Sequence, residues 1–468
     1  MSIHAHYRLV ETIFFRKIGS VVYVHNVATG EDFIFSEDAG PIFVALRNGK
    51  SARASMLLGQ EDFIRELHAY GIVSFCDEHD VGRATNLTIG SNPPMRHLAQ
   101  NEDIVSRVQE ECRKRHLLWS AGLELTYRCN ERCRHCYCDL QKERASAKEL
   151  TESEWLKSVD QLSRMGCMNV LVTGGEPTLH PAFGTICERI VNRGMLCDVY
   201  TNGLKISNRL FDSLCKLPLN SISVSLYSGT AAFHDEITGV AGSFQKPFAT
   251  LMRFKEAGLN AYAKVPVFHG HLKDYFSAKE LGRKNGFRTL ASTILVPGHS
   301  GETRNPMMMS ASEYEIFLKR ETKPDTSVEK TSSIEKFRNE PLCQAGQSTL
   351  CISPFGDVMP CNSFPAVCGN VRQGSLAKIW RTSDVLKRLR NLRRCDVSMR
   401  CASCADIAYC TICPGASWSE THGRIVPCSW SCEQTRVRAD FNRKKKRRKN
   451  EDKDDCESYG WRTAGYCP

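Results

Sequence analysis

The sequence predicts an α/β protein built around a partial (β/α)6 barrel of the TIM type. Three observations lead to this fold class. Between Leu123 and about Val296, six short apolar segments alternate with amphipathic helical patterns, which favours a parallel sheet with right-handed helical crossovers. A smaller unit with an α+β, winged-helix-like pattern precedes this region, and a block rich in cysteine follows it.

The composition predicts several domains in a reducing environment. The chain has 468 residues, of which 41% are hydrophobic and 25% charged, enough for two or three cores. No apolar run approaches the roughly 18 residues that span a bilayer, and the N-terminus lacks a signal-peptide pattern. We therefore expect a cytoplasmic protein without a membrane partner. Its 23 cysteines stand at metal-ligand spacings, which favours thiolate ligands over disulfides.

The net charge of +11 does not predict a nucleic-acid partner. Residues 443–449, RKKKRRK, carry seven of these charges, which leaves +4 for the rest of the chain. No aromatic residues are interleaved with the run to stack on bases, so we interpret it as a solvated segment.

The N-terminal unit is expected over residues 1–76. Three strands are predicted in FFRKIG, VVYVHN and EDFIFS, separated by turn signals at Gly19 and Gly30. Two helices are predicted at Glu37 to Arg47 and at Glu61 to Tyr70, where apolar residues recur at helical spacing. Residues 77–117 are polar and contain Gly and Pro, so we interpret them as a linker.

The barrel is expected over residues 118–318. Its strands are predicted in LELTY, NVLVT, CDVYT, SISVSL, AYAKVPVF and TLASTILV. Ligands of such sheets gather at the carboxyl ends of the strands. The sequence CNERCRHC follows the first strand, Gly174 to Pro177 follow the second, and Thr201 to Gly203 follow the third.

The remainder divides into three segments. Residues 319–340 are charged and are predicted to be a second linker. Residues 341–435 hold eleven cysteines and only short apolar strands, TLCIS and DVMPC. Because such strands bury little area, we expect metal ligation to supply much of this domain's folding free energy. Residues 436–468 lack periodicity and are expected to be a disordered tail.

Three cysteines, Cys129-x3-Cys133-x2-Cys136, predict a catalytic metal centre after the first strand. Three thiolates can hold three irons of a [4Fe-4S] cubane and leave the fourth iron open, whereas a zinc site is the plainer alternative. The pattern and its place resemble the radical S-adenosylmethionine superfamily. The resemblance implies that the open iron binds S-adenosylmethionine, which is then cleaved to methionine and a 5′-deoxyadenosyl radical.

The same resemblance assigns the cofactor's other contacts. Gly174, Gly175, Glu176 and Pro177 match the family's GGEP segment, which receives the methionine ammonium, and the glycines allow close approach. Asn202 and Ser225, at the ends of the third and fourth strands, match positions near the ribose and carboxylate. Without the resemblance, Asn202 would be interpreted as a turn residue and Ser225 as an ordinary hydroxyl of the core.

The cysteine-rich block resembles the SPASM domain, an extension of radical enzymes that binds two auxiliary [4Fe-4S] clusters, although a pair of zinc ribbons would also fit the CxxC spacings. The resemblance implies one cluster on Cys343, Cys361 and Cys413, with Cys351 as a possible fourth ligand. It implies a second on Cys401, Cys404, Cys410 and either Cys428 or Cys432.

The N-terminal unit resembles the PqqD-like leader-recognition domains, through VYVHNVATGEDFIFSEDAGPIFVALRNG and DFIRELHAYGIV. The resemblance implies that an unstructured leader peptide adds as a strand beside Glu31 to Ser36 and against the helix from Asp62 to Tyr70. A structural cap without a ligand is the alternative.

Together these features predict a radical enzyme that modifies a ribosomally made precursor peptide and takes electrons from a flavodoxin or ferredoxin. Auxiliary clusters can accept the electron that a crosslink releases, so we expect oxidative crosslinking through a thioether or carbon–carbon bond, with epimerisation also open. A sulfatase-type maturase is a second hypothesis, which Asn362 disfavours because that group has an acidic residue there. A non-catalytic peptide-binding module is the third.

Overall fold

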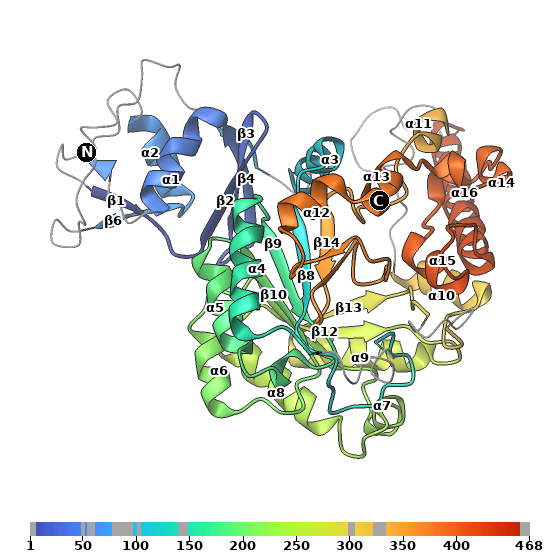
Figure 1. The fold of residues 1–468 in the computed structure, drawn as a ribbon. Helices are drawn as coiled ribbons and strands as arrows, with labels where there is room; N and C mark the ends of the chain where they lie inside the picture. The colour runs from blue at the N-terminus through green and yellow to red at the C-terminus, as the bar shows by residue number, and fades with distance from the viewer. Residues whose placement is uncertain are drawn as a thin grey trace.

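The protein is described by a computed structural model over residues 6–47, 52–53, 61–76, 97–100, 104–138, 148–297, 305–321 and 334–458. The first part of the predicted linker at 77–117, the middle of the one at 319–340, and residues 459–468 of the predicted tail lie outside these ranges. Figure 1 shows the barrel between the N-terminal domain on one side and the cysteine-rich region on the other.

The six predicted barrel strands are confirmed, and each pairs in parallel with its neighbour. The first strand lies three residues earlier than predicted: Ser120 to Glu124 pair with Asn169 to Thr173, and beyond the strand the Leu125 amide donates one more hydrogen bond to the Thr173 carbonyl, at 2.9 Å. The strands are β8 (Ser120–Glu124), β9 (Asn169–Thr173), β10 (Leu196–Thr201), β11 (Ser221–Ser225), β12 (Ala261–Pro266) and β13 (Arg288–Ser292).

Alternation along these strands separates a helix-covered face from an inner face. Buried side chains such as Val172, Val199 and Val265 belong to the main core, which the covering helices complete. The next residues along the strands, such as Tyr200 and Lys264, point to the inner face. The covering helices are α4 (Glu152–Arg164), α5 (Phe183–Asn192), α6 (Asn208–Cys215), α8 (Gln245–Glu256) and α9 (Leu272–Asn285).

The first half of the cysteine-rich block is built onto the barrel sheet. Strand β14 (Thr349–Ile352) pairs in parallel with β8, and β15 (Asp357–Met359) and β16 (Gly369–Asn370) continue the sheet antiparallel. Leu350, Ile352 and Val358 are buried in the barrel core. The expectation that these strands bury little is therefore wrong, because an existing sheet edge supplies the partner surface that they lack alone.

The rest of this block is made of short helical pieces. Helices α12 (Leu376–Thr382) and α13 (Asp384–Asn391) still contribute Leu376, Trp380 and Leu386 to the barrel core. After Asn391 the chain continues in short helical elements, and residues 391–406 are half-buried or exposed. They are η6 (Arg394–Val397), α14 (Met399–Ala402), η7 (Ile407–Tyr409) and α15 (Pro414–Glu420). Metal ligation can therefore dominate the folding free energy only in this second half.

The N-terminal domain contains the three predicted strands, β2 (Ile13–Ile18), β3 (Val21–Asn26) and β4 (Glu31–Ser36), in an antiparallel sheet. The first predicted helix forms as η1 (Glu37–Ala39) and α1 (Gly40–Arg47), and the second as α2 (Glu61–Ala69). Both pack their apolar residues on one face of the sheet. A small second sheet holds β5 (Ala52–Arg53), β1 (His6–Leu9) and β6 (Val73–Cys76).

Part of the predicted linker is structured. Strand β7 (His97–Gln100) pairs antiparallel with β4, with Phe33 opposite Gln100 and Ile34 opposite Ala99. The edge at Glu31 to Ser36, predicted to be open for a leader, is therefore occupied by the chain itself. Helix α3 (Ile104–Arg115) follows. The polar composition hid both elements, because their stability comes from partners far away in the sequence.

Helix α3 joins the N-terminal domain to the barrel. The sheet face opposite α1 and α2 packs Phe14, Tyr23 and Ile34 against α3 and against Trp119 and Met168, which precede the first two barrel strands. Arg16 also donates two hydrogen bonds to the Cys167 carbonyl, at 2.8 and 3.1 Å. The N-terminal domain thus sits at the amino ends of the barrel strands.

The predicted disordered tail begins as a helix. Helix α16 (Ser429–Ser458) packs against α10 (Ala311–Glu321), with Ala439 fully buried and Arg438 bonded to the Tyr314 hydroxyl. The dense charges concealed the apolar side chains Val437 and Phe441, which also pack on the core. The second linker likewise contains structure at its ends, since α10 reaches Glu321 and α11 spans Ile334–Arg338. In the described part of the chain, every helix is too short or too polar to cross a bilayer.

Candidate active site and metal centres

The three motif cysteines lie on one loop at the carboxyl end of β8. The Cys136 N–H donates to the Cys133 carbonyl at 3.1 Å, and the Glu131 N–H approaches the Cys129 sulfur at 3.4 Å. Burial raises the pKa of the Cys129 thiol to about 11 and raises the pKa of the Cys133 thiol even more. The electrostatic interaction with Cys136 also raises both pKa values. Metal binding must therefore overcome the proton affinity of these thiols.

Helix α7 (Ala231–Thr238) holds this loop in place. The Arg132 and Arg134 amides donate to the carbonyls of Thr238 and Ile237 at 2.8 and 3.0 Å. Asp235 in turn accepts hydrogen bonds from the Gly242 and Phe244 amides at 2.6 and 2.9 Å. Residues 234–244, with the sequence HDEITGVAGSF, therefore support the cysteine loop.

His135 is packed under the loop by aromatic rings. Its ring lies 4.9 Å from those of Tyr227 and Phe268. His234 stacks on the other side of Tyr227 and accepts a hydrogen bond from the Tyr227 amide at 3.1 Å. Burial of the imidazole lowers the pKa of His135 to about 4, so the ring is neutral at physiological pH.

Gly174 and Gly175, which follow β9, are required because the backbone there passes very close to the backbone of residues 125–128. A Cβ on Gly174 would lie 2.5 Å from the Thr126 carbonyl oxygen, and one on Gly175 would lie 2.6 Å from that of Arg128. Gly174 also has φ of 140°, in the region that favours glycine. The close contact is thus with the segment leading into the cysteine loop, rather than only with a ligand as the motif suggested.

Glu176 joins two strand ends next to the loop. Its carboxylate accepts hydrogen bonds from the Thr178 amide at 3.1 Å, the Thr201 hydroxyl at 2.7 Å and the Asn202 amide at 2.6 Å. The Asn202 side chain donates to Asn130 in the cysteine loop at 2.6 Å. The structure therefore brings Gly174 to Pro177 and Asn202 together around the loop.

Ser225 lies at the end of β11 on the inner face, two residues before Tyr227. Its hydroxyl interacts with the phenol of Tyr227, which approaches the Cys133 sulfur at 3.7 Å. The position predicted for a cofactor contact is thus close to the cysteine loop.

Two buried glutamates near the loop were missed. Glu124 is fully buried on the inner face of β8 and accepts hydrogen bonds from the Tyr127 and Tyr137 hydroxyls at 2.7 and 3.0 Å. Burial raises its pKa to about 7. Glu131, 3.5 Å from the Cys133 sulfur, has its pKa raised to about 7 by burial as well. Strand alternation could have identified Glu124, whereas no local signal marked Glu131.

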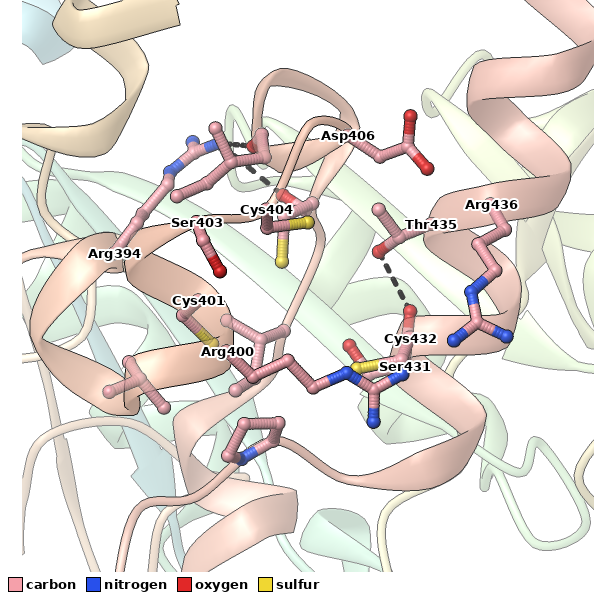
Figure 2. A pocket seen from close by; sticks show the side chains of 15 residues that line it. Arg394, Arg400, Cys401, Ser403, Cys404, Asp406, Ser431, Cys432, Thr435 and Arg436 are labelled. Carbon is pink, nitrogen blue, oxygen red and sulfur yellow. Dashed lines mark hydrogen bonds between the residues drawn. The ribbon is translucent and has the colours of Figure 1, made fainter.

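Four of the predicted auxiliary ligands line one cavity of about 250 Å³. Figure 2 shows Cys401, Cys404 and Cys432 around it, together with arginine side chains. Cys410 lines it as well, whereas Cys428 packs with Trp430 and other apolar residues. Of the two alternatives that the sequence leaves open, Cys432 lines this cavity and Cys428 does not.

The other predicted set gathers between the barrel and α15. Burial raises the pKa of the Cys343 thiol to about 12 and raises the pKa of the Cys361 thiol even more. The electrostatic interaction with Cys413 also raises both pKa values. Cys351 is buried on β14, and its sulfur would lie 3.1 Å from a Cβ on Gly122, so the glycine makes room for it. Cys351 is within electrostatic influence of Cys361.

The chemistry of these thiol groups is compatible with iron–sulfur clusters. Among the residues that the structure describes, no three His, Cys, Asp or Glu side chains converge closely enough to hold one metal ion. A cubane requires a wider arrangement, because each thiolate binds a different iron. The residues present, three thiols on one loop and four around one cavity, fit that requirement.

Comparison with known proteins agrees with the site. Residues 123–278 match the radical SAM superfamily, and residues 343–405 match the SPASM iron-sulfur cluster-binding domain. The chain therefore contains the catalytic domain of radical S-adenosylmethionine enzymes. More particularly, it combines that catalytic domain with a SPASM domain, so its cofactors are S-adenosylmethionine, the [4Fe-4S] cluster of the radical domain and the iron–sulfur clusters of the SPASM domain.

Its relatives include enzymes with different substrates. AdoMet-dependent heme synthase of Methanosarcina barkeri is 24% identical over 319 residues, which cover 61% of this chain and 90% of the relative. PqqA peptide cyclase of Granulibacter bethesdensis is 26% identical over 280 residues, which cover 57% and 75%. The structure of Streptococcus suis SuiB bound to precursor peptide SuiA aligns with a TM-score of 0.59 at 15% identity and covers 91% of this chain and 99% of SuiB. At that identity the likeness shows the fold.

Proposed function

We propose that this radical enzyme modifies a ribosomally made precursor peptide by hydrogen abstraction followed by oxidative crosslinking. The observation that carries the proposal is the fold match to SuiB, which is complexed with its precursor peptide and aligns with nearly the whole chain. The peptide cyclase among the relatives supports the same substrate class. The heme synthase aligns over 61% of this chain and the peptide cyclase over 57%, so the extent of these two alignments does not separate their substrate classes.

The chain's own residues would divide the work among three centres. Cys129, Cys133 and Cys136 would hold the first cluster and leave one iron for S-adenosylmethionine, beside Asn202 and Ser225. When bound, that cofactor supplies the hydrogen-abstracting radical, and the auxiliary clusters supply an electron acceptor. The buried rings of Tyr227 and Phe268, packed against His135, would keep water away from the reaction.

The auxiliary ligands follow from the two thiol groups. Cys401, Cys404, Cys410 and Cys432 would hold one cluster in their common cavity. Cys343, Cys361 and Cys413 would hold the other. Cys351 would complete that set, because its thiol interacts electrostatically with that of Cys361. Cys351 lies on β14, the strand that pairs with β8 of the barrel. A flavodoxin or ferredoxin would deliver the first electron.

The N-terminal domain would hold the leader of the precursor. Strand addition beside β4 then requires β7 to leave that edge, because β7 already occupies its main-chain hydrogen-bonding groups. The domain lies at the amino ends of the barrel strands, whereas the cysteine loop lies at the carboxyl ends. A strand of five residues spans about 17 Å, so at least about five extended residues must separate the leader from the modified residue.

The test begins with S-adenosylmethionine cleavage. The protein is reconstituted anaerobically with iron and sulfide, reduced, and assayed for 5′-deoxyadenosine. We expect cleavage in the wild type and none after replacement of Cys129, Cys133 and Cys136 by alanine, with the auxiliary absorbance retained. A protein that binds about twelve irons but forms no 5′-deoxyadenosine would support the non-catalytic module instead.

Coexpression identifies the substrate. Short peptides encoded beside the gene are coexpressed with the wild type or the triple alanine variant, and their masses are compared. Loss of two hydrogens per modification supports a crosslink, whereas unchanged mass with altered stereochemistry supports epimerisation. Cleavage that is stimulated by a porphyrin and by none of these peptides would contradict the proposed substrate class.

A further inference from the structure

One buried hydroxyl lies at the thiol cavity, the cavity that is shared by Cys401, Cys404, Cys410 and Cys432. Ser431 belongs to α16, directly precedes Cys432, and is only 2% exposed. It lines the thiol cavity, and Figure 2 shows it beside Cys432. Within the described residues, the Ser431 hydroxyl oxygen is buried and makes no hydrogen bond.

The other two hydroxyl side chains that line the thiol cavity are already engaged. Ser403 donates to the Met399 carbonyl at 3.3 Å, and Thr435 donates to the Ser431 carbonyl at 2.7 Å. Both bonds run to the preceding turn of the chain, as hydroxyls in helices commonly do. Ser431 makes no bond of this kind in the part of the chain that the structure describes, so its donor is left for the cavity.

A second donor at the thiol cavity is also without an acceptor. Arg394 lines the cavity, and its Nε–H is buried and unbonded in the described residues, although its terminal nitrogens bind two carbonyls and the Glu340 carboxylate. The charge of Arg400 opposes the burial that raises the pKa of the Cys432 thiol. Two hydrogen-bond donors and a further cation therefore surround the place that the four thiols share, which suits an anion that accepts hydrogen bonds.

An unpaired hydroxyl at this position is costly unless a bound group completes it. A buried polar group without a partner has lost its hydrogen bonds to water and gained none in return, and an alanine would avoid that loss. The sulfurs of an iron–sulfur centre accept hydrogen bonds, which stabilise the negative charge that reduction adds and so raise the reduction potential. The group that the four thiols would hold thus supplies the acceptor that Ser431 lacks.

We propose that the Ser431 hydroxyl donates a hydrogen bond to a sulfur of the iron–sulfur centre in the thiol cavity and thereby raises the reduction potential of that centre. Its part in turnover rests on the proposed function, in which closing a crosslink releases one electron. A higher potential favours transfer of that electron to this centre. The hydrogen bond itself depends on neither the substrate nor the bond that is formed.

Potentiometric titration tests the proposal without turnover. The full chain is reconstituted with iron and sulfide in the background in which Cys129, Cys133 and Cys136 are alanine, so that only the auxiliary centres remain. Electron paramagnetic resonance follows their reduction, and Cys432→Ser identifies the signal of the thiol cavity because it removes a ligand. We expect Ser431→Ala to make reduction of that centre about tenfold less favourable, a potential lower by about 59 mV for one electron. The other auxiliary signal should not move.

Ser403→Ala is the matched control. It removes a hydroxyl from the same cavity, but that hydroxyl already donates to the Met399 carbonyl, so both potentials should stay where they are. Iron content and thermal unfolding are measured for each variant, and we expect Ser431→Ala to fold and to bind as much iron as the parent protein.

The proposal is overturned if Ser431→Ala has the parent potential at this centre, or if Ser403→Ala lowers that potential equally. Loss of iron from Ser431→Ala alone would also overturn it, because the hydroxyl would then be needed to bind the metal rather than to adjust its potential. Neither S-adenosylmethionine cleavage nor a peptide enters the measurement, so these outcomes are distinct from failure of the proposed peptide modification.

Discussion

A methyl group added at Gly175 should displace the cysteine loop and destabilise the barrel. An alanine Cβ there would stand 2.6 Å from the Arg128 oxygen, 2.8 Å from the Tyr127 oxygen and 2.9 Å from the Tyr127 carbonyl carbon. Ordinary contacts of this kind are about 3.5–4.0 Å, so the chain must yield by close to an ångström. All three atoms are backbone, and Cys129 follows them directly.

The magnitude follows from the atoms that must move. Overpacking a well-packed site costs about 1–3 kcal/mol, and we expect about 3 kcal/mol because no flexible side chain can give way. For a folding unit of about 150–250 residues, that lowers Tm by about 6–12 °C. Thermal unfolding of the metal-free protein measures the change. Iron content after reconstitution should also fall, since the shifted loop no longer presents its three thiols together.

A matched glycine supplies the control. Gly184 lies in α5, where an alanine Cβ would meet only a Leu210 methyl group at 3.8 Å, an ordinary contact. Gly184→Ala should leave stability unchanged or raise it by up to about 1 kcal/mol. Wild-type Tm and iron content in Gly175→Ala would refute the reasoning, because they would mean that the loop and the segment after β9 are not in steric contact.

Three further predictions concern other parts of the molecule. Burial raises the Glu124 pKa from 4.5 to about 7, so its stability contribution is complete below about pH 4.5 and is lost as the pH rises through about 7. The free energy of unfolding of the wild type, measured with urea, should fall by roughly 3 kcal/mol as the pH rises across that window. A Glu124→Gln variant whose free energy of unfolding falls equally over the same window would contradict this prediction. Ala439→Glu, which buries a charge at a fully buried position of α16, should cost about 3 kcal/mol or more in the same assay, while Ala257→Glu at an exposed site should cost less than about 1 kcal/mol. Cys432→Ser should remove about four of about twelve irons, whereas Cys428→Ser should retain them, and the reverse pattern would exchange the two roles.

Much of the catalytic domain could be predicted because its signals are local. The six strands appear in the sequence as apolar segments of five to eight residues, and that local pattern is sufficient to predict a strand. The order of strands and helices then places the Cys129 loop and the Gly174 segment at the same end of the sheet. Errors arose where stability comes from distant partners, as for β7 on the edge of β4 and for α16 on α10.

The sequence by itself determined the metal-binding loop, because the spacing from Cys129 to Cys136 fixes how far apart three thiols can be on a short stretch of chain. Only the tertiary structure decided that Cys432, rather than Cys428, joins the common cavity, that Ser431 lines it, and that β14 extends the barrel. Spacing limits the distance between residues that are close in sequence. Spacing does not determine which residues that lie far apart in the sequence come into contact. The packing of the tertiary structure determines those contacts.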